Sequence, residues 1–567
     1  MTAVDTAPPA PVAIRERRRP RSATLGLVVL VALLGYLVLV PLIQLLVAVA
    51  EGGAAAAGNA VAGRGLGSAI VTTVVLTLGS LAIAMVLGVG MAALSVRLPR
   101  GWRWTAVLPI LPVVAPAVAS VTGWAFLFSP RSGYANALLR MVPFVGGDSG
   151  PVDVYTAPWI VVITGITLSS FVYVFVRTGM LNLDRGLLEA AQVAGLSPGR
   201  AFLRIQLPLL RPVLVYAAGI SLLLGLGQFT VPLLLGTASG VEVLATRIYR
   251  FTADTPADYA AAALVGSPLL VLGIALVLLQ RLALGDQTRF VAHSGKGAWR
   301  TSRPVRWAPV PLLVFALVAV VLPLAALVVV ALSPFYSARI QPSMFTLANF
   351  TRLFRTPFVL DAVMTSLMAS IAGALLALVL GYLAATVIHE RRWPRTARML
   401  DVLVNLPLGV PAVVYGAGFL YAYSRPPVVL YGTDAVIVVV YLTLMLPYAT
   451  RSLLGARIAL GDDYLAASRV AGAGPLRTHL QIVVPLMRAA IGGAVALMFV
   501  LLTHEFTASL LVRSGTTQVM GTKLFDLWSN GSYPQVAAMA LVMTGITAAG
   551  VVVAMAASGG SNPLERL

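Results

Sequence analysis

The chain has 567 residues, of which 59% are hydrophobic and only 11% are charged, and its mean hydropathy is +0.91. Soluble domains carry about 25% charged residues, and several apolar runs here exceed the ~20 residues that cross a bilayer. These numbers exclude a large soluble helical protein. We therefore expect an all-α membrane protein.

The formal net charge is +20, yet the placement of the basic residues argues against a nucleic-acid partner. Lysines and arginines lie in short segments between apolar runs rather than in a stripe interleaved with aromatic residues, which is the pattern of cytoplasmic loops in membrane proteins. The chain has no cysteine, so disulfides, thiol-attached haem and thiolate metal sites are also excluded.

Hydrophobic runs divide the chain into two sets of six predicted transmembrane helices. The apolar run from residue 24 to residue 50 is well beyond the ~7–15 residues of a signal-peptide core, so we expect it to stay as the first membrane helix. The first six predicted spans are 24–50, 68–95, 105–128, 157–178, 209–235 and 259–281. The second six are 308–332, 361–388, 399–422, 434–451, 487–512 and 535–557.

An even number of spans in each set predicts two parallel repeats related by an axis along the membrane normal. With both termini in the cytoplasm, most of the 40 lysine and arginine residues lie on the cytoplasmic side, as the positive-inside rule requires. The predicted organisation is a cytoplasmic basic tail, a first transmembrane domain, a cytoplasmic linker, a second transmembrane domain and a cytoplasmic tail, at 1–23, 24–281, 282–306, 307–558 and 559–567.

One polar stretch occurs twice, 277 positions apart, and each copy precedes the fifth predicted span of its set. Residues 189–208 read EAAQVAGLSPGRAFLRIQLP, and residues 466–485 read AASRVAGAGPLRTHLQIVVP. Each copy predicts a short helix that is broken at a glycine, followed by a second short helix that ends at a proline. Small residues on such a unit allow a second protein to approach closely, so the unit is suited to docking a cytosolic partner.

The pattern Glu-Ala-Ala, three residues, Gly, nine residues, Ile-x-Leu-Pro resembles the EAA loop of binding-protein-dependent ABC transporter permeases of the type I importer fold. Residues 189–208 match it completely, whereas the second copy has Ala466 for the glutamate, Ser468 for the second alanine and Val484 for the leucine. The resemblance implies that these residues couple the chain to an ATPase: Glu189, Ala190, Ala191, Gly195, Ile205, Pro208, Ala466, Ala467, Gly472, Ile482 and Pro485.

The resemblance implies a permease subunit in the inner (plasma) membrane that is not itself an enzyme. Its implied partners are a pair of cytosolic ATPase subunits, which would bind the ATP, and an extracytoplasmic solute-binding protein. The chain has no G-x-x-x-x-G-K-[ST] phosphate loop, and Gly515–Lys523 lacks the required spacing. We therefore expect no cofactor on this chain.

Polar residues inside the fifth span of each set are candidates for the translocation path. Gln228 and Glu505 occupy equivalent positions in the two sets, and His504 is adjacent to Glu505. Polar and charged residues at membrane depth are costly and commonly functional. They also form interhelical hydrogen bonds, and this alternative stays open. Adjacent residues do not share one helix face, so a metal site at His504 and Glu505 is disfavoured.

Three further features give local predictions. Prolines in the third spans, among them Pro109, Pro116 and Pro411, should kink those helices. Gly79, Gly88 and Gly90 should allow close helix packing. In the outer loops, Arg247 and Lys523 would either meet acidic groups of a binding protein or extend to the membrane surface.

The substrate is implied only by resemblance. Segments such as FTVPLLLG and VLATRIY are similar to those of fused ferric-iron uptake permeases, and thiamine, polyamine and phosphonate importers are close alternatives. A rival from another class is an ion-coupled transporter of the major facilitator type, which also has twelve spans but needs no docking loops. A membrane-embedded enzyme is disfavoured because the four histidines form no metal-spaced set with carboxylates.

Overall fold

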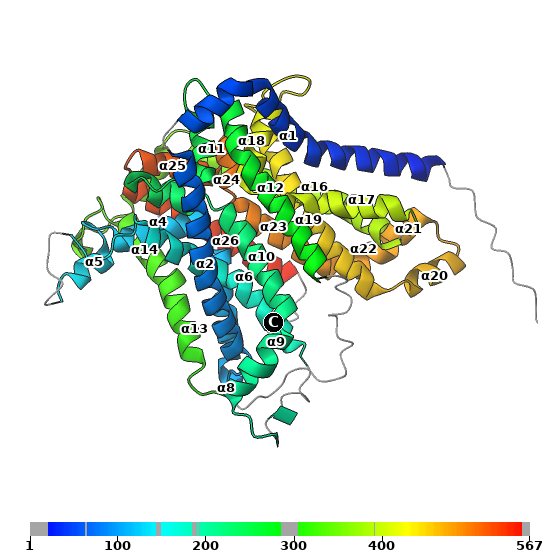
Figure 1. The fold of residues 1–567 in the computed structure, drawn as a ribbon, viewed down its shortest axis with the longest axis horizontal. Helices are drawn as coiled ribbons and strands as arrows, with labels where there is room; N and C mark the ends of the chain where they lie inside the picture. The colour runs from blue at the N-terminus through cyan, green and yellow to red at the C-terminus, as the bar shows by residue number, and fades with distance from the viewer. Residues whose placement is uncertain are drawn as a thin grey trace, which may run out of the picture.

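The computed structural model describes residues 21–62, 65–142, 149–183, 190–191, 193–284, 304–390 and 392–557, and helices make up all of its regular elements there. Figure 1 shows a helical body with α11 and α25 at one end. The elements before residue 285 are α1 (Arg21–Ala62), α2 (Leu66–Ser95), η1 (Arg100–Ile110), α3 (Leu111–Val114), α4 (Ala117–Phe128), α5 (Tyr134–Leu139), α6 (Ala157–Leu181), α8 (Pro198–Ala201), η2 (Phe202–Gln206), α9 (Leu207–Leu209), α10 (Arg211–Leu226), η3 (Pro232–Gly236), η4 (Thr237–Ser239), α11 (Leu244–Ala253) and α12 (Tyr259–Leu284).

The second part of the chain repeats this order closely. Its elements are α13 (Pro309–Ala316), η6 (Leu317–Val321), α14 (Leu322–Leu332), η7 (Pro342–Met344), α15 (Ala348–Arg355), α16 (Val359–Glu390), α17 (Pro394–Asn405), η8 (Leu406–Gly409), α18 (Ala412–Tyr423), α19 (Asp434–Leu460), α20 (Asp463–Val470), α21 (Pro475–Thr478), η9 (His479–Val483), α22 (Val484–Leu486), α23 (Arg488–Thr503), α24 (Thr507–Val512), α25 (Met520–Ser529) and α26 (Tyr533–Ala557). Residues 1–20, 285–303 and 558–567 lie outside the described residues, and with them most of the predicted linker and tails.

Within the described residues, eight helices are long and apolar enough to cross a membrane, and the number rises to twelve if each of four bent pairs is one span. The bent pairs occupy equivalent places in the two parts of the chain. The third spans bend by 94° and 106°, and the helices that lead into the fifth spans bend by 72° and 73°. The chain is therefore a multi-pass membrane protein whose two parts repeat the same irregularities.

Prolines cause the bends in the third spans. Ala115 and Val410 have extended backbone conformations (ψ 134° and 124°) directly before Pro116 and Pro411. A proline disfavours the helical conformation in the residue that precedes it, so each helix stops there and a new one begins. The predicted kinks at Pro116 and Pro411 are confirmed, whereas Pro109 lies inside the helix η1.

The fifth predicted spans, 209–235 and 487–512, are wrong as continuous helices. α10 ends at Leu226 and α23 ends at Thr503, and in each case three residues outside any helix follow, 227–229 and 504–506. Hydropathy did not reveal these interruptions because the flanking residues are apolar throughout. Each interruption contains a polar residue from the predicted path, Gln228 or Glu505.

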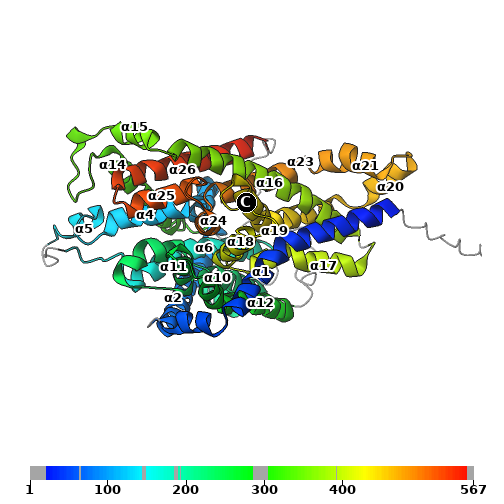
Figure 2. The ribbon, with the colours of Figure 1, turned by 90° about the horizontal axis from the view of Figure 1, so that it is seen from above.

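The first span of each part packs against the other part of the chain. α1 contacts α17 and α18, and α14 contacts α4 (Figure 2). The crossings are close: a Cβ on Gly418 would lie 2.5 Å from the Pro41 carbonyl oxygen, and a Cβ on Gly123 would lie 2.6 Å from that of Pro323. Only glycine fits at these two points. The two parts are thus joined by two equivalent glycine–proline crossings.

Glycines also set the packing of α2 on α6. A Cβ on Gly79 would lie 2.9 Å from Val161, and one on Gly88 would lie 2.6 Å from Val172, so the predicted close packing is confirmed at these two positions. At Gly90 a Cβ would meet nothing within 4 Å, so the prediction is wrong there.

Candidate functional site

The two copies of the repeated stretch have the same backbone geometry at their glycine breaks. Gly195 has φ +81° and Gly472 has φ +79°, the left-handed conformation that glycine adopts most readily at a helix end. In both copies the backbone N–H that follows the glycine donates to a carbonyl five residues back, from Leu196 to Ala191 and from Ala473 to Ser468, each at 3.0 Å. The glycine therefore fixes the same angle between two short helices in each copy. We call residues 190–208 and 462–485 the first and second coupling segments, after the role that the sequence resemblance implies for them.

The prediction that the second short helix of each copy ends at its proline is wrong. Pro208 lies inside α9 and Pro485 lies inside α22. A turn of π-helix that contains Ile205 or Ile482 precedes each proline. A proline has no N–H to donate, and a wider turn is one way in which a helix accommodates it. The sharp bends come two residues later, at Leu210 and Met487.

The inner faces of the two segments are held by different chemistry. In the first, Ala191 and Ala201 are both buried. In the second, the buried residues at the same positions are Ser468 and Thr478, whose hydroxyl oxygens lie 2.6 Å apart. This pair was not predicted from the sequence, although the 277-residue spacing that relates the two copies also relates these positions.

The second segment has a polar attachment to the end of α16. The Tyr382 hydroxyl lies 2.7 Å from His479 Nδ1, and His389 Nε2 lies 3.1 Å from an oxygen of Asp462. The contact with His389 lowers the pKa of the Asp462 carboxyl below its ordinary value. At the position of His479 the first segment has Phe202, which packs on an apolar cluster with α6 and α10.

The outward faces of the segments carry small and apolar residues beside exposed arginines such as Arg200 and Arg477. Ala190, Ala466 and Ala467 are exposed, and Val193 and Val470 have 89% and 90% of their surface exposed. Figure 1 shows α8–α9 and α20–α22 at two separate ends of the body, both remote from α11 and α25. Glu189 and Gln192 lie outside the described residues.

The predicted path residue Gln228 lies in the interruption after α10 and is 8% exposed. Thr164 of α6 donates a hydrogen bond of 2.9 Å to its side-chain oxygen. The interhelical contact proposed as an alternative role is therefore present. Within the described residues, the Gln228 side-chain nitrogen has no hydrogen-bond partner.

Glu505 caps the helix that follows the second interruption. Its carboxylate accepts hydrogen bonds from the backbone N–H groups of Ala508 (2.8 Å) and Ser509 (3.0 Å) at the start of α24. Ser509 Oγ also lies 3.1 Å from the hydroxyl of Tyr441 on α19. Tyr441 is the counterpart of Thr164, so both interruptions are linked to the helix that leads into a coupling segment.

His504 occupies the last position before Glu505, and its Nε2 is buried without a hydrogen-bond partner among the described residues. Groups of three or more histidine, aspartate or glutamate side chains able to hold a metal are absent from the described part of the chain. Each interruption thus contains one buried side-chain nitrogen, of Gln228 or of His504, that is able to form a further hydrogen bond.

Arg247 does not meet either of its predicted roles. It is 6% exposed, lies 3.4 Å from Glu242 and donates a hydrogen bond to the Ala60 carbonyl, so it reaches neither a binding protein nor the membrane surface. Its counterpart Lys523 lies with its amino group over the ring of Phe358. These contacts attach α11 and α25 to their own parts of the chain.

Comparison with known proteins identifies the repeats. The family model described as "Binding-protein-dependent transport system inner membrane component" matches residues 70–284 and again residues 377–563. The chain belongs to this permease family. It holds two copies of the family's domain, and α1, α13 and α14 lie entirely outside the matched regions.

Three relatives show the range of the family around this permease. A probable ABC transporter permease protein from Sinorhizobium fredii is 26% identical over 66% of this chain and 67% of its own length. A putative ferric transport system permease protein from Haemophilus influenzae is 24% identical over 77% of this chain and 69% of its own. A putative 2-aminoethylphosphonate transport system permease protein from Salmonella typhimurium is 26% identical over 40% of this chain and 84% of its own. The chain spans about two thirds of the length of the first two.

Proposed function

We propose that this chain forms the complete membrane pathway of an ATP-driven, binding-protein-dependent importer. The observation that carries the proposal is the pair of coupling segments, which share their left-handed glycine, their π-helical turn and a bend of 72° or 73°. Two equivalent coupling segments with exposed small residues suit two equivalent binding sites on a dimeric partner. The ATP would be bound and hydrolysed by that partner.

The proposed topology has twelve spans, each bent pair counting as one, in two parallel sets of six. Both termini and both coupling segments lie in the cytoplasm. Support comes from the concentration of arginine in the segments assigned to that side and from the equal number of spans in the two repeats. On this topology α11 and α25 face outward, where a solute-binding protein would deliver its cargo.

The proposed translocation path passes between the two interruptions. Gln228 and His504 each keep a buried nitrogen unpaired within the described residues, and a buried polar group left unpaired costs about 1–3 kcal/mol. Water or a passing solute would relieve that cost. Glu505 would act mainly by capping α24 and holding His504 in place.

Ferric iron is the first solute to test, because a ferric permease matches across most of this chain. Phosphonates come second, on the shorter match. Thiamine and polyamines follow from the sequence resemblance alone.

The deciding experiment is uptake into vesicles that hold the purified permease, with and without its ATPase and binding protein. Uptake should require ATP and both partners. Uptake driven by an ion gradient alone would show instead a secondary transporter of the major facilitator type, the rival with the same number of spans.

The docking role has a direct test in the exposed valines. Val193→Asp and Val470→Asp should each abolish co-purification of the ATPase, because a charge on the contact face must be desolvated. Leu138→Asp, at an exposed apolar residue of α5, is the matched control and should leave ATPase binding intact. Unchanged binding with both valine variants would contradict the docking role.

A further inference from the structure

Four aromatic rings, two from each half, meet in a closed circuit beside the helix interruptions. The ring centroids of Phe229 and Phe506 lie 5.8 Å apart, and those of Tyr249 and Phe525 lie 6.1 Å apart. Phe229 contacts Tyr249 and Phe506 contacts Phe525, each pair at 5.9 Å. Every ring thus touches one ring of its own half and one of the other half. These distances are those of favourable aromatic pairs.

The circuit extends from the interruptions, whose last residues are Phe229 and Phe506, to α11 and α25. Phe229 and Phe506 directly follow Gln228 and Glu505 in the chain, and both phenylalanines are almost completely buried. Tyr249 and Phe525 belong to α11 and α25 and are only partly buried. The rings are therefore arranged in two layers, with the phenylalanine pair next to the polar residues and the Tyr249–Phe525 pair beyond it.

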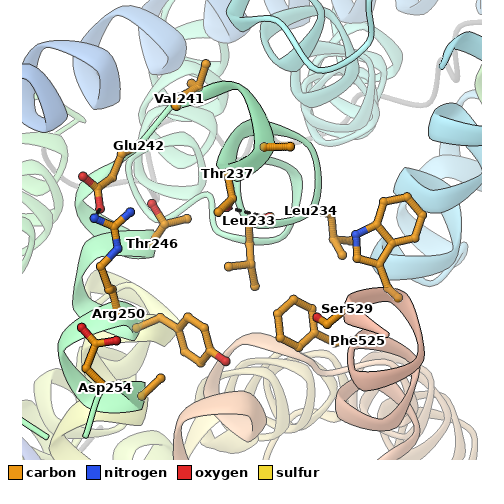
Figure 3. A pocket seen from close by; sticks show the side chains of 15 residues that line it. Leu233, Leu234, Thr237, Val241, Glu242, Thr246, Arg250, Asp254, Phe525 and Ser529 are labelled. Carbon is orange, nitrogen blue, oxygen red and sulfur yellow. Dashed lines mark hydrogen bonds and ion pairs between the residues drawn. The ribbon is translucent and has the colours of Figure 1, made fainter. Parts of the chain in front are cut away.

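A cavity of about 500 Å³ lies beyond the second layer, and Tyr249 and Phe525 form part of its lining. Figure 3 shows residues of α11 and the loop before it on one side of this cavity and Phe525 and Ser529 of α25 on the other. Glu242 and Arg250, paired at 3.0 Å, provide a charged edge. The volume lies within the range of small-molecule sites.

We propose that these four rings are the outer gate of the transport path, and that the cavity beyond them receives the solute before the gate opens. The proposal rests on the proposed function, because it assumes that α11 and α25 face outward. Three phenylalanine rings and the ring of Tyr249 exclude water and hydrophilic solutes from the passage between the cavity and the level of Gln228. Contacts between rings of different halves break when the halves separate, so the motion that ATP drives at the coupling segments would open this gate.

The chain contains no cysteine, which allows a clean cross-linking test. In Tyr249→Cys/Phe525→Cys, both thiols line the cavity and are open to short bifunctional methanethiosulfonates. Uptake with the ATPase, binding protein and ATP should fall about tenfold on cross-linking and return with a reductant, because one conformation is then locked. Phe128→Cys/Trp159→Cys is the matched control: these rings lie 5.6 Å apart within one half, and their cross-linking should leave uptake unchanged.

Two outcomes separate a wrong gate from a wrong function. If the cross-linked gate pair, verified by mass spectrometry, transports as fast as the reduced protein, the rings are not a gate. If the unaltered permease shows no ATP-dependent uptake, the proposed importer function fails, and the gate is judged by leakage alone.

Leakage needs no ATPase and no known solute. Phe229→Ala/Phe506→Ala should release entrapped potassium from vesicles at least about fivefold faster than the unaltered permease, because the inner pair of rings no longer fills the passage. Phe128→Ala/Trp159→Ala serves as the control for nonspecific loosening. Equal leakage from both double variants would overturn the proposal.

Discussion

The first and second coupling segments have the same backbone conformation, but different side-chain contacts stabilise it in each. Both have a left-handed glycine, a π-helical turn before a proline, and a bend close to 72°. The first is fixed by buried alanines and by Phe202 on an apolar cluster. The second is fixed by a Ser468–Thr478 contact and by histidine contacts with α16. The angle between the short helices is thus retained while the side chains that support it have changed.

The largest expected effect comes from the shared glycines. Gly195→Val or Gly472→Val should reduce ATP-dependent uptake at least about tenfold, because an L-residue in the left-handed conformation costs roughly 1–2 kcal/mol and a β-branched one more. No atom lies within 4 Å of a Cβ at either position, so the cost is conformational rather than steric.

The control substitutions separate the conformational cost at the two glycines from a steric one. Asparagine tolerates the left-handed conformation, so Gly195→Asn and Gly472→Asn should retain most of the uptake. Gly199→Ala changes a glycine in α8 with equally open surroundings and should be neutral. Equal loss with valine and asparagine would show that bulk, not backbone angle, matters at these positions. A strong effect in one segment alone would show that the two segments do not contribute equally.

The next prediction tests whether the two glycine–proline crossings, where the first span of each half packs against the other half, contribute equally to stability. Gly123→Ala and Gly418→Ala each place a Cβ within 2.6 Å of a proline carbonyl oxygen, and overpacking of this kind costs about 1–3 kcal/mol. Both should lower the melting temperature of the detergent-solubilised permease by similar amounts. Gly455→Ala, where a Cβ meets nothing, is the control. A large effect at one crossing and none at the other would contradict their equivalence.

A smaller effect is expected when the buried residues of the first coupling segment are replaced by those of the second. Ala191→Ser buries a hydroxyl at the position equivalent to Ser468, without the threonine that Ser468 contacts, and should destabilise the first segment by about 1–3 kcal/mol. Adding Ala201→Thr recreates the pair found in the second segment and should recover most of that loss. Hydrogen exchange of the segment's amides measures both changes. If the second substitution adds to the damage, the two segments are not interchangeable in their packing.

The sequence predicted the repeat but not the places where each repeat is interrupted. Composition and periodicity identified the apolar spans, and the 277-residue spacing identified both coupling segments. Proline chemistry identified the bends at Pro116 and Pro411. The interruptions at 227–229 and 504–506 were missed because an apolar run has the same hydropathy whether its helix is continuous or broken.

The partners of these polar residues were missed for a related reason. Thr164 and Tyr441 differ in chemistry, and only the fold shows that each faces the interruption of its own half. Arg247 illustrates the opposite error: a basic residue in an outer loop was expected at the surface, yet Glu242 and the Ala60 carbonyl bind it in the interior.

The smallest effect concerns the charge that distinguishes the second segment from the first. The contact with His389 lowers the pKa of Asp462, so the carboxylate is stabilised by folding. A depressed carboxyl pKa contributes stability above the ordinary aspartate value of about 3.9, and that contribution is lost as the pH falls through the lower folded value.

The carboxyl carbon shift of Asp462 should titrate below the ordinary value, and His389→Gln should move the midpoint upward. Because Asp462 is exposed, transport near neutral pH should barely change in this variant. A marked loss of uptake would mean that the second segment depends on its polar attachment in a way that the first, held by Phe202, does not.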